Sequence, residues 1–111
     1  MSVPSAAELL THMREAATQA VTYVDGLDKA DFLTDKRTQQ AVILNLIILG
    51  EAATKLMDHH ADVVSRYPAI EWRSMRGMRN RIAHGYYDIN LDVVWETVSS
   101  ALPELVEKLG D

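Results

Sequence analysis

The groups best suited to chemistry lie in residues 72–87, a segment with four arginines, one asparagine, one histidine and two tyrosines. Arginine stays charged at any physiological pH, whereas histidine gains or loses a proton near neutrality. Together they can hold a phosphate and transfer a proton beside it. The segment therefore predicts a cationic site for a phosphate-containing ligand. The candidate site residues in it are Arg73, Arg76, Arg79, Asn80, His84 and Tyr86.

An α-helix over residues 72–84 would have one apolar side and one polar side. Asn80 and His84 are four residues apart and would be neighbours on the polar side. Arg79 falls among the apolar positions, where an unpaired guanidinium is costly, so we expect a carboxylate or a polar cleft opposite it. Arg79 and His84 would be about 140° apart on an ideal helix. They converge if the helix loosens near Gly85 or if the arginine reaches around, and we expect both.

The carboxylate that could meet this arginine is Glu51, which lies within the most apolar part of the chain. A buried carboxylate needs a cation beside it, and the Arg79 guanidinium, placed among apolar residues, needs an anion. We therefore expect Glu51 to pair with Arg79 or to orient it through a hydrogen bond. The alternative, that Glu51 points to solvent directly after Gly50, stays open.

Residues 79–84 read Arg-Asn-Arg-Ile-Ala-His and resemble the HEPN superfamily signature, in which an arginine precedes a histidine after four to six residues. With Gly85 and Tyr86 the segment resembles the R-x4-H-x-Y form of HepT-like toxins. Further similarity lies in residues 50–53, in Trp72 and the residues up to Asn80, and in residues 89–95. The resemblance therefore covers most of the chain.

This resemblance implies an all-α, HEPN-like fold and a metal-independent endoribonuclease that works as a homodimer and leaves a 2′,3′-cyclic phosphate. It implies a toxin of a toxin–antitoxin pair, whose partner is a nucleotidyltransferase antitoxin. By motif position, Tyr86 would be the residue that the antitoxin adenylylates to O-AMP-tyrosine. The alternative is a noncatalytic HEPN module that binds a nucleotide or the partner protein through the same arginines.

The candidate residues can be given roles in RNA cleavage. His84 would serve as general base or acid, and Arg79 would hold the nonbridging phosphate oxygens. Asn80 would orient the phosphate or the imidazole. Because one histidine cannot easily fill both proton-transfer roles, a two-fold dimer would supply the second one. Tyr86 would lie at the rim and could stack on a base, whereas we expect Tyr87 to pack between helix ends.

Composition limits the class of protein. The chain has 111 residues and 48% hydrophobic residues, which predicts a single domain spanning residues 1–111. The net charge of −5 argues against nonspecific nucleic-acid binding, but residues 66–81 hold five of the seven arginines and one acid, Glu71. A local cationic patch on an acidic protein suits a site that meets a phosphate.

The absence of cysteines excludes disulfides and thiolate ligands and is compatible with the cytoplasm, where we expect the protein. The apolar run 41–49 is shorter than the ~20 residues of a membrane helix, so we expect no membrane partner. We expect no cofactor. We also expect no metal site, because His59 and His60 are adjacent and their side chains diverge on a helix.

Helical periodicity predicts four main helices: one after Ser5, one from Asp35 to about His60, one over residues 72–84, and one after the cap Asn90. The expected architecture is an up-and-down four-helix bundle with short extra helical turns. The helix of residues 35–60 is apolar nearly all the way round, which predicts a homodimer with this helix at or near the interface. The alternative is a central helix enclosed by its own neighbours.

Overall fold

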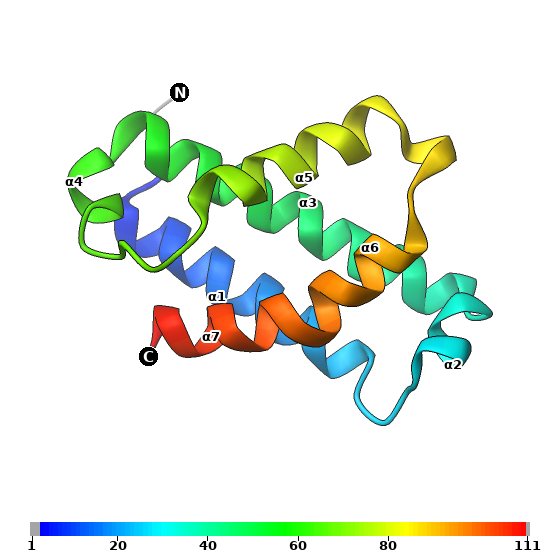
Figure 1. The fold of residues 1–111 in the computed structure, drawn as a ribbon. Coiled ribbons are helices and arrows are strands. Elements are labelled where there is room, and N and C mark those ends of the chain that lie inside the picture. The colour runs from blue at the N-terminus through cyan, green and yellow to red at the C-terminus, as the bar shows by residue number, and fades with distance from the viewer. Residues whose placement is uncertain (1–2, 111) are drawn as a thin grey trace.

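The computed structural model describes residues 3–110, and every regular element in that range is helical (Figure 1). The expected all-α class is therefore confirmed. In chain order the elements are α1 (Ala6–Tyr23), α2 (Lys29–Leu33), α3 (Lys36–His59), α4 (Ala61–Val64), α5 (Trp72–His84), the 3₁₀ turn η1 (Tyr86–Asp88), α6 (Leu91–Glu96), the π-helical turn η2 (Thr97–Ala101) and α7 (Leu102–Leu109).

Polar side chains cap the helices where the sequence predicts their starts. The Ser5 hydroxyl accepts a hydrogen bond of 3.1 Å from the backbone N–H of Glu8, and Asn90 accepts from two N–H groups of α6. Asp35 accepts from both the hydroxyl and the backbone N–H of Thr38. These hydrogen bonds, that from the Thr38 hydroxyl first, lower the pKa of Asp35.

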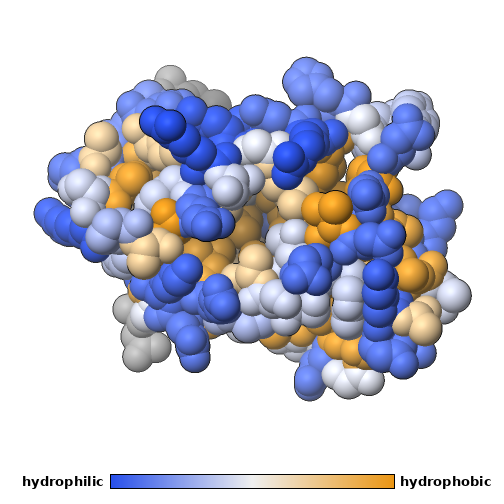
Figure 2. All heavy atoms as spheres, viewed as in Figure 1, coloured by the Kyte–Doolittle hydropathy of each residue, from blue (hydrophilic) through white to orange (hydrophobic). Residues whose placement is uncertain are grey.

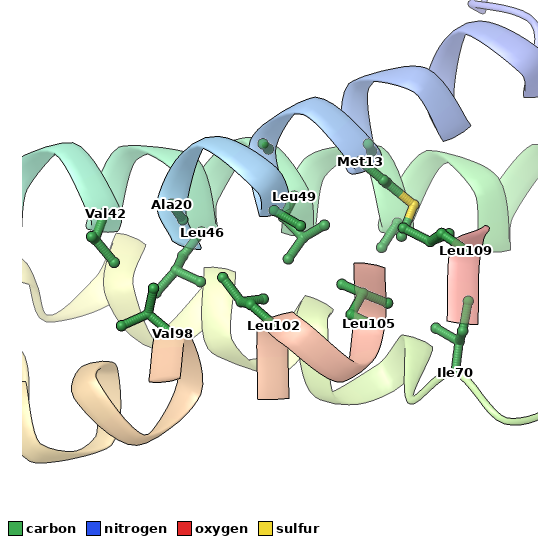
Figure 3. Close-up of a cluster of buried hydrophobic side chains, with 14 of the residues drawn as sticks. Met13, Ala20, Val42, Leu46, Leu49, Ile70, Val98, Leu102, Leu105 and Leu109 are labelled. Atoms are coloured by element: carbon green, nitrogen blue, oxygen red, sulfur yellow. The ribbon is translucent and has the colours of Figure 1, made fainter. Parts of the chain in front are cut away.

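The core forms around α3, which packs against α1 and against α5, while α7 packs against α1 (Figure 1). Burial of aliphatic side chains from all four helices excludes water from the space between them. Figure 3 shows the buried cluster that joins α1, α3 and the C-terminal helical segment. Its labelled members are Met13, Ala20, Val42, Leu46, Leu49, Ile70, Val98, Leu102, Leu105 and Leu109.

The C-terminal segment is helical from Leu91 to Leu109 but is not regular throughout. A π-helical turn, η2, lies immediately before Pro103. Proline has no N–H to donate within a helix, and its ring crowds the preceding turn. A wider π turn relieves that crowding without ending the helix, so the segment continues past the proline.

The bundle is open between α5 and α7. The two helices line a groove of about 370 Å³ whose floor includes Leu46 and Leu49 of α3. Figure 2 shows hydrophobic atoms within this hollow, bordered by hydrophilic side chains. The expected up-and-down four-helix bundle stays a prediction.

The central helix α3 is only partly covered by its own chain. By length and composition alone it could cross a membrane, because an 18-residue window has a mean hydropathy of 1.4. The uninterrupted apolar run 41–49 covers only part of this window. In this structure 44% of the window is buried against the rest of the chain. The core helix of a globular protein meets the same criterion of length and hydropathy. Leu44 is 57% exposed and Ile48 37% exposed, one helical turn apart, so α3 keeps an uncovered apolar stripe.

Candidate functional site

Helix α5 carries most of the predicted site residues. Trp72 and Ile82 are buried against the bundle and fix the orientation of the helix. The α-helix continues without interruption to His84, and Gly85 follows it as the C-cap. Gly85 thus ends the helix, as expected of a glycine, but the α-helical hydrogen-bonding pattern extends to the last turn, so the helix does not loosen before His84. On a regular α-helix, positions 79 and 84 are about 140° apart.

The predicted contact between Glu51 and Arg79 is present. Arg79 Nη1 donates a hydrogen bond to Glu51 Oε1, and Arg79 Nη2 donates one of 3.4 Å to Thr54 Oγ1. The Arg79 side chain is 20% exposed and that of Glu51 is 48% exposed, so the arginine is the more enclosed partner. Glu51 thus does not simply point to solvent. It holds the guanidinium at a partly open surface of α3 and α5.

Gly50 allows α3 and α5 to approach closely enough for this contact. A Cβ atom at position 50 would collide with Arg79 Cβ and lie 2.8 Å from the Met75 carbonyl oxygen. The Met75 oxygen is a backbone atom and Arg79 Cβ is bonded directly to the backbone, so neither atom can move away by rotation of a side chain. This role of Gly50 was not predicted from the sequence, although a glycine in the middle of a long apolar helix indicates close backbone approach.

The remaining arginines separate into different environments. Arg76 forms a 2.7 Å salt bridge with Asp58 of α3, a partner that the sequence reasoning did not anticipate. Arg73 is exposed, and Arg81 is exposed at the edge of the groove between α5 and α7. The arginine cluster is therefore not one surface. Arg73, Arg76 and Arg79 are the members that could serve a site on the α3 side.

Asn80 and His84 lie one turn apart on the outer face of α5, and both are exposed. Within residues 3–110 neither side chain forms a hydrogen bond. Their polar atoms are thus available to a ligand or to a second protein surface. The imidazole can exchange protons with a bound group, because nothing in the described part of the chain occupies its nitrogens.

Two tyrosines follow the helix in η1. The ring centroids of Tyr86 and Tyr87 are 4.1 Å apart with an interplanar angle of 34°, and the Tyr86 hydroxyl donates a hydrogen bond of 2.7 Å to Tyr87. This hydrogen bond stabilises the neutral phenol and raises the pKa of Tyr86. Tyr86 is 59% exposed and Tyr87 is 84% exposed. The prediction that Tyr87 packs between helix ends is therefore wrong.

The described residues 3–110 contain no group of three or more histidine, aspartate or glutamate side chains that could hold a metal ion. His60 Nε2 lies 3.1 Å from the Pro4 carbonyl oxygen. This contact gives His60 a structural role in joining the N-terminal segment to the end of α3.

These features define an all-α protein with a fixed arginine and an accessible histidine on one helix. The family model "Ribonuclease HepT-like" matches residues 13–110, and the chain belongs to this family. The resemblance to HEPN proteins that the 79–86 motif indicated is thereby confirmed.

Several curated relatives are similar over most of the chain. The "Probable ribonuclease HepT" of Thermococcus cleftensis is 41% identical over 70% of this chain and 68% of its own length. The "Putative RNase MJ0127" of Methanocaldococcus jannaschii is 28% identical over 94% of this chain and 80% of its own length. The "Putative RNase TTE0752" of Caldanaerobacter subterraneus is 29% identical over 92% of this chain and 88% of its own length. The family and these names support ribonuclease activity. No solved structure matches the chain.

The contact between Glu51 and Arg79 leads to a prediction for RNA cleavage. Glu51→Ala removes the acceptor that orients the guanidinium and is expected to lower the rate constant of RNA cleavage about 10- to 100-fold, because small displacements of a positioned group are costly. Glu51→Gln keeps an acceptor oxygen and should retain much more activity. The measurement is single-turnover cleavage of a labelled RNA, with Glu15→Ala on α1 as the control. Cleavage by Glu51→Ala at the wild-type rate would show that this contact serves stability alone.

Proposed function

We propose that this protein is a metal-independent endoribonuclease, the toxin of a toxin–antitoxin pair, acting as a homodimer in the cytoplasm. The observation that carries the proposal is a guanidinium, Arg79, fixed by α3 on the helix that ends with an exposed imidazole, His84. Membership in the ribonuclease HepT-like family supports it.

In the proposed reaction, His84 removes the proton from a ribose 2′-hydroxyl, and that oxygen attacks the adjacent phosphorus. The bond from phosphorus to the 5′-oxygen breaks, which leaves a 2′,3′-cyclic phosphate. A second imidazole, that of the partner subunit's His84, donates a proton to the departing oxygen. Arg79 stabilises the negative charge that develops on the nonbridging oxygens, and Asn80 orients the phosphate or the imidazole.

A dimer supplies what a single protomer lacks. Within one protomer Arg79 is bound to Glu51 and Thr54 of α3, whereas the His84 side chain is exposed and has no hydrogen-bond partner in residues 3–110. A two-fold axis beside this surface would bring a second pair of groups to a shared cleft. The uncovered Leu44 and Ile48 lie on α3, which also carries Glu51, and they give the dimer an apolar contact.

This arrangement predicts that Leu44→Asp weakens the dimer and lowers RNA cleavage together, because a charge would be buried in the apolar contact. Sedimentation velocity at micromolar concentration measures the association. Leu33→Asp alters another exposed leucine, on α2, and should leave both properties unchanged. A wild-type protein that sediments as a monomer at this concentration would contradict the dimer.

The proposed partner is a nucleotidyltransferase antitoxin that adenylylates Tyr86. The hydroxyl of Tyr86 is accessible in η1 but donates a hydrogen bond to Tyr87, which must break first. The Tyr86 oxygen then attacks the α-phosphorus of ATP bound by the antitoxin, pyrophosphate leaves, and the phenolic proton passes to solvent or to a base of the antitoxin. An attached AMP group would add bulk and negative charge next to His84, and this would block the binding of RNA. Mass spectrometry of Tyr86 after coexpression with a neighbouring nucleotidyltransferase gene tests this step.

The direct test is digestion of a labelled RNA by the purified protein in excess EDTA. The proposal expects cleavage that persists in EDTA and products that end in a 2′,3′-cyclic phosphate. Cleavage that EDTA abolishes would contradict metal independence. Absence of cleavage together with RNA or nucleotide binding would favour the second candidate, a noncatalytic HEPN binding module, which the exposed Arg73 could serve equally well.

A further inference from the structure

Tyr86 and Tyr87 form one continuous aromatic surface, the tyrosine pair. Their rings contact each other at a tilt of 34°, their hydroxyls are joined by a hydrogen bond, and the Tyr87 side of the pair is 84% exposed. Adjacent side chains of an α-helix diverge, but the 3₁₀ turn η1 brings these two rings together. A contiguous exposed aromatic surface of this kind indicates a binding site rather than an ordinary solvent-exposed residue.

The surroundings of the tyrosine pair favour a nucleic acid. The pair directly follows the helix that exposes Arg81 and His84, and these polar groups are suited to a phosphate backbone. The base of a nucleotide has a flat face that can stack on a tyrosine ring. The phosphate of the same nucleotide carries a negative charge that an exposed arginine such as Arg81 can bind. A protein partner has a more apolar surface available on α3, where Leu44 and Ile48 are exposed.

We propose that Tyr87 is a substrate-binding residue on which an unpaired base stacks, next to the phosphate that His84 contacts, with the Tyr86 ring packed against it. The inference rests on the proposed function and names its substrate class, RNA with an unpaired nucleotide at the cleavage site. A base inside an A-form duplex is already stacked on both faces and cannot lie on a tyrosine ring. The pair therefore selects single-stranded segments over duplexes.

Binding can be measured separately from cleavage by placing all variants in a His84→Ala background with EDTA. The probe is a single-stranded oligoribonucleotide that contains 2-aminopurine, whose emission falls when it stacks, compared with a duplex of the same length. Tyr87→Ala and Tyr87→Leu are expected to raise the Kd for the single strand about tenfold or more, whereas Tyr87→Phe keeps the ring and the affinity. Tyr23→Ala, at an exposed tyrosine on α1, should change nothing.

Each outcome decides a specific point. An unchanged Kd for Tyr87→Ala and Tyr87→Leu, or equal affinity for duplex and single strand, overturns the inference. Loss of dimerisation in Tyr87→Ala, measured by sedimentation, also overturns it, because the ring would then belong to a protein interface. Tyr87-dependent binding of the single strand by a wild-type protein that cleaves no RNA would uphold the inference while removing the proposed nuclease.

Discussion

His84→Ala is expected to lower the rate of RNA cleavage in excess EDTA by about 10²–10⁴-fold, the range typical of a lost general acid or base. The substitution removes the one histidine of α5. In the proposed dimer it removes both proton-transfer groups at once. Arg79→Ala should cause a loss of about 10²–10³-fold, because it removes a preorganised donor to the developing negative charge.

These losses are measured by single-turnover cleavage of a labelled RNA with enzyme in excess. His84 is exposed and forms no side-chain hydrogen bond within residues 3–110, so His84→Ala should leave the thermal unfolding temperature nearly unchanged. The matched control is His12→Ala, at an exposed histidine of α1, which should retain full activity. Equal residual cleavage by wild type, His84→Ala and Arg79→Ala would assign the activity to a contaminating nuclease.

Gly50→Ala is expected to lower the free energy of unfolding by about 1–3 kcal/mol, the usual cost of overpacking a tight contact. The added methyl group would meet Arg79 Cβ and the Met75 carbonyl oxygen, neither of which can rotate away. Alanine is the better helix former by roughly 1 kcal/mol, and this gain offsets part of the cost. The remaining strain separates α3 from α5 and displaces Arg79 from Glu51, so cleavage should fall as well.

Gly77→Ala is the matched control for this substitution, because it lies on α5 and a Cβ atom there would meet nothing within 4 Å. It should stabilise the protein by roughly 0.5–1 kcal/mol through helix propensity alone. Urea unfolding of both variants gives the comparison. If Gly50→Ala proves as stable as Gly77→Ala, the close approach of α3 and α5 does not constrain position 50.

Local chemistry in the sequence was sufficient to predict the helical elements. The caps Ser5, Asp35 and Asn90 begin α1, α3 and α6 because their side chains satisfy N–H groups a few residues away. The pairing of Glu51 with Arg79 was also accessible, since two opposite charges placed among apolar residues each require a partner. Periodicity further indicated that α3 has more apolar surface than its own chain covers.

Only the tertiary structure decided which groups meet across helices. It assigned Arg76 to Asp58, left Tyr87 exposed and held α5 helical to His84, with Arg79 bound to Glu51 of α3. The physical reason is that periodicity specifies the face of a side chain on its own helix but not how closely another helix approaches. That approach depends on small residues at single crossing points, and here it depends on Gly50.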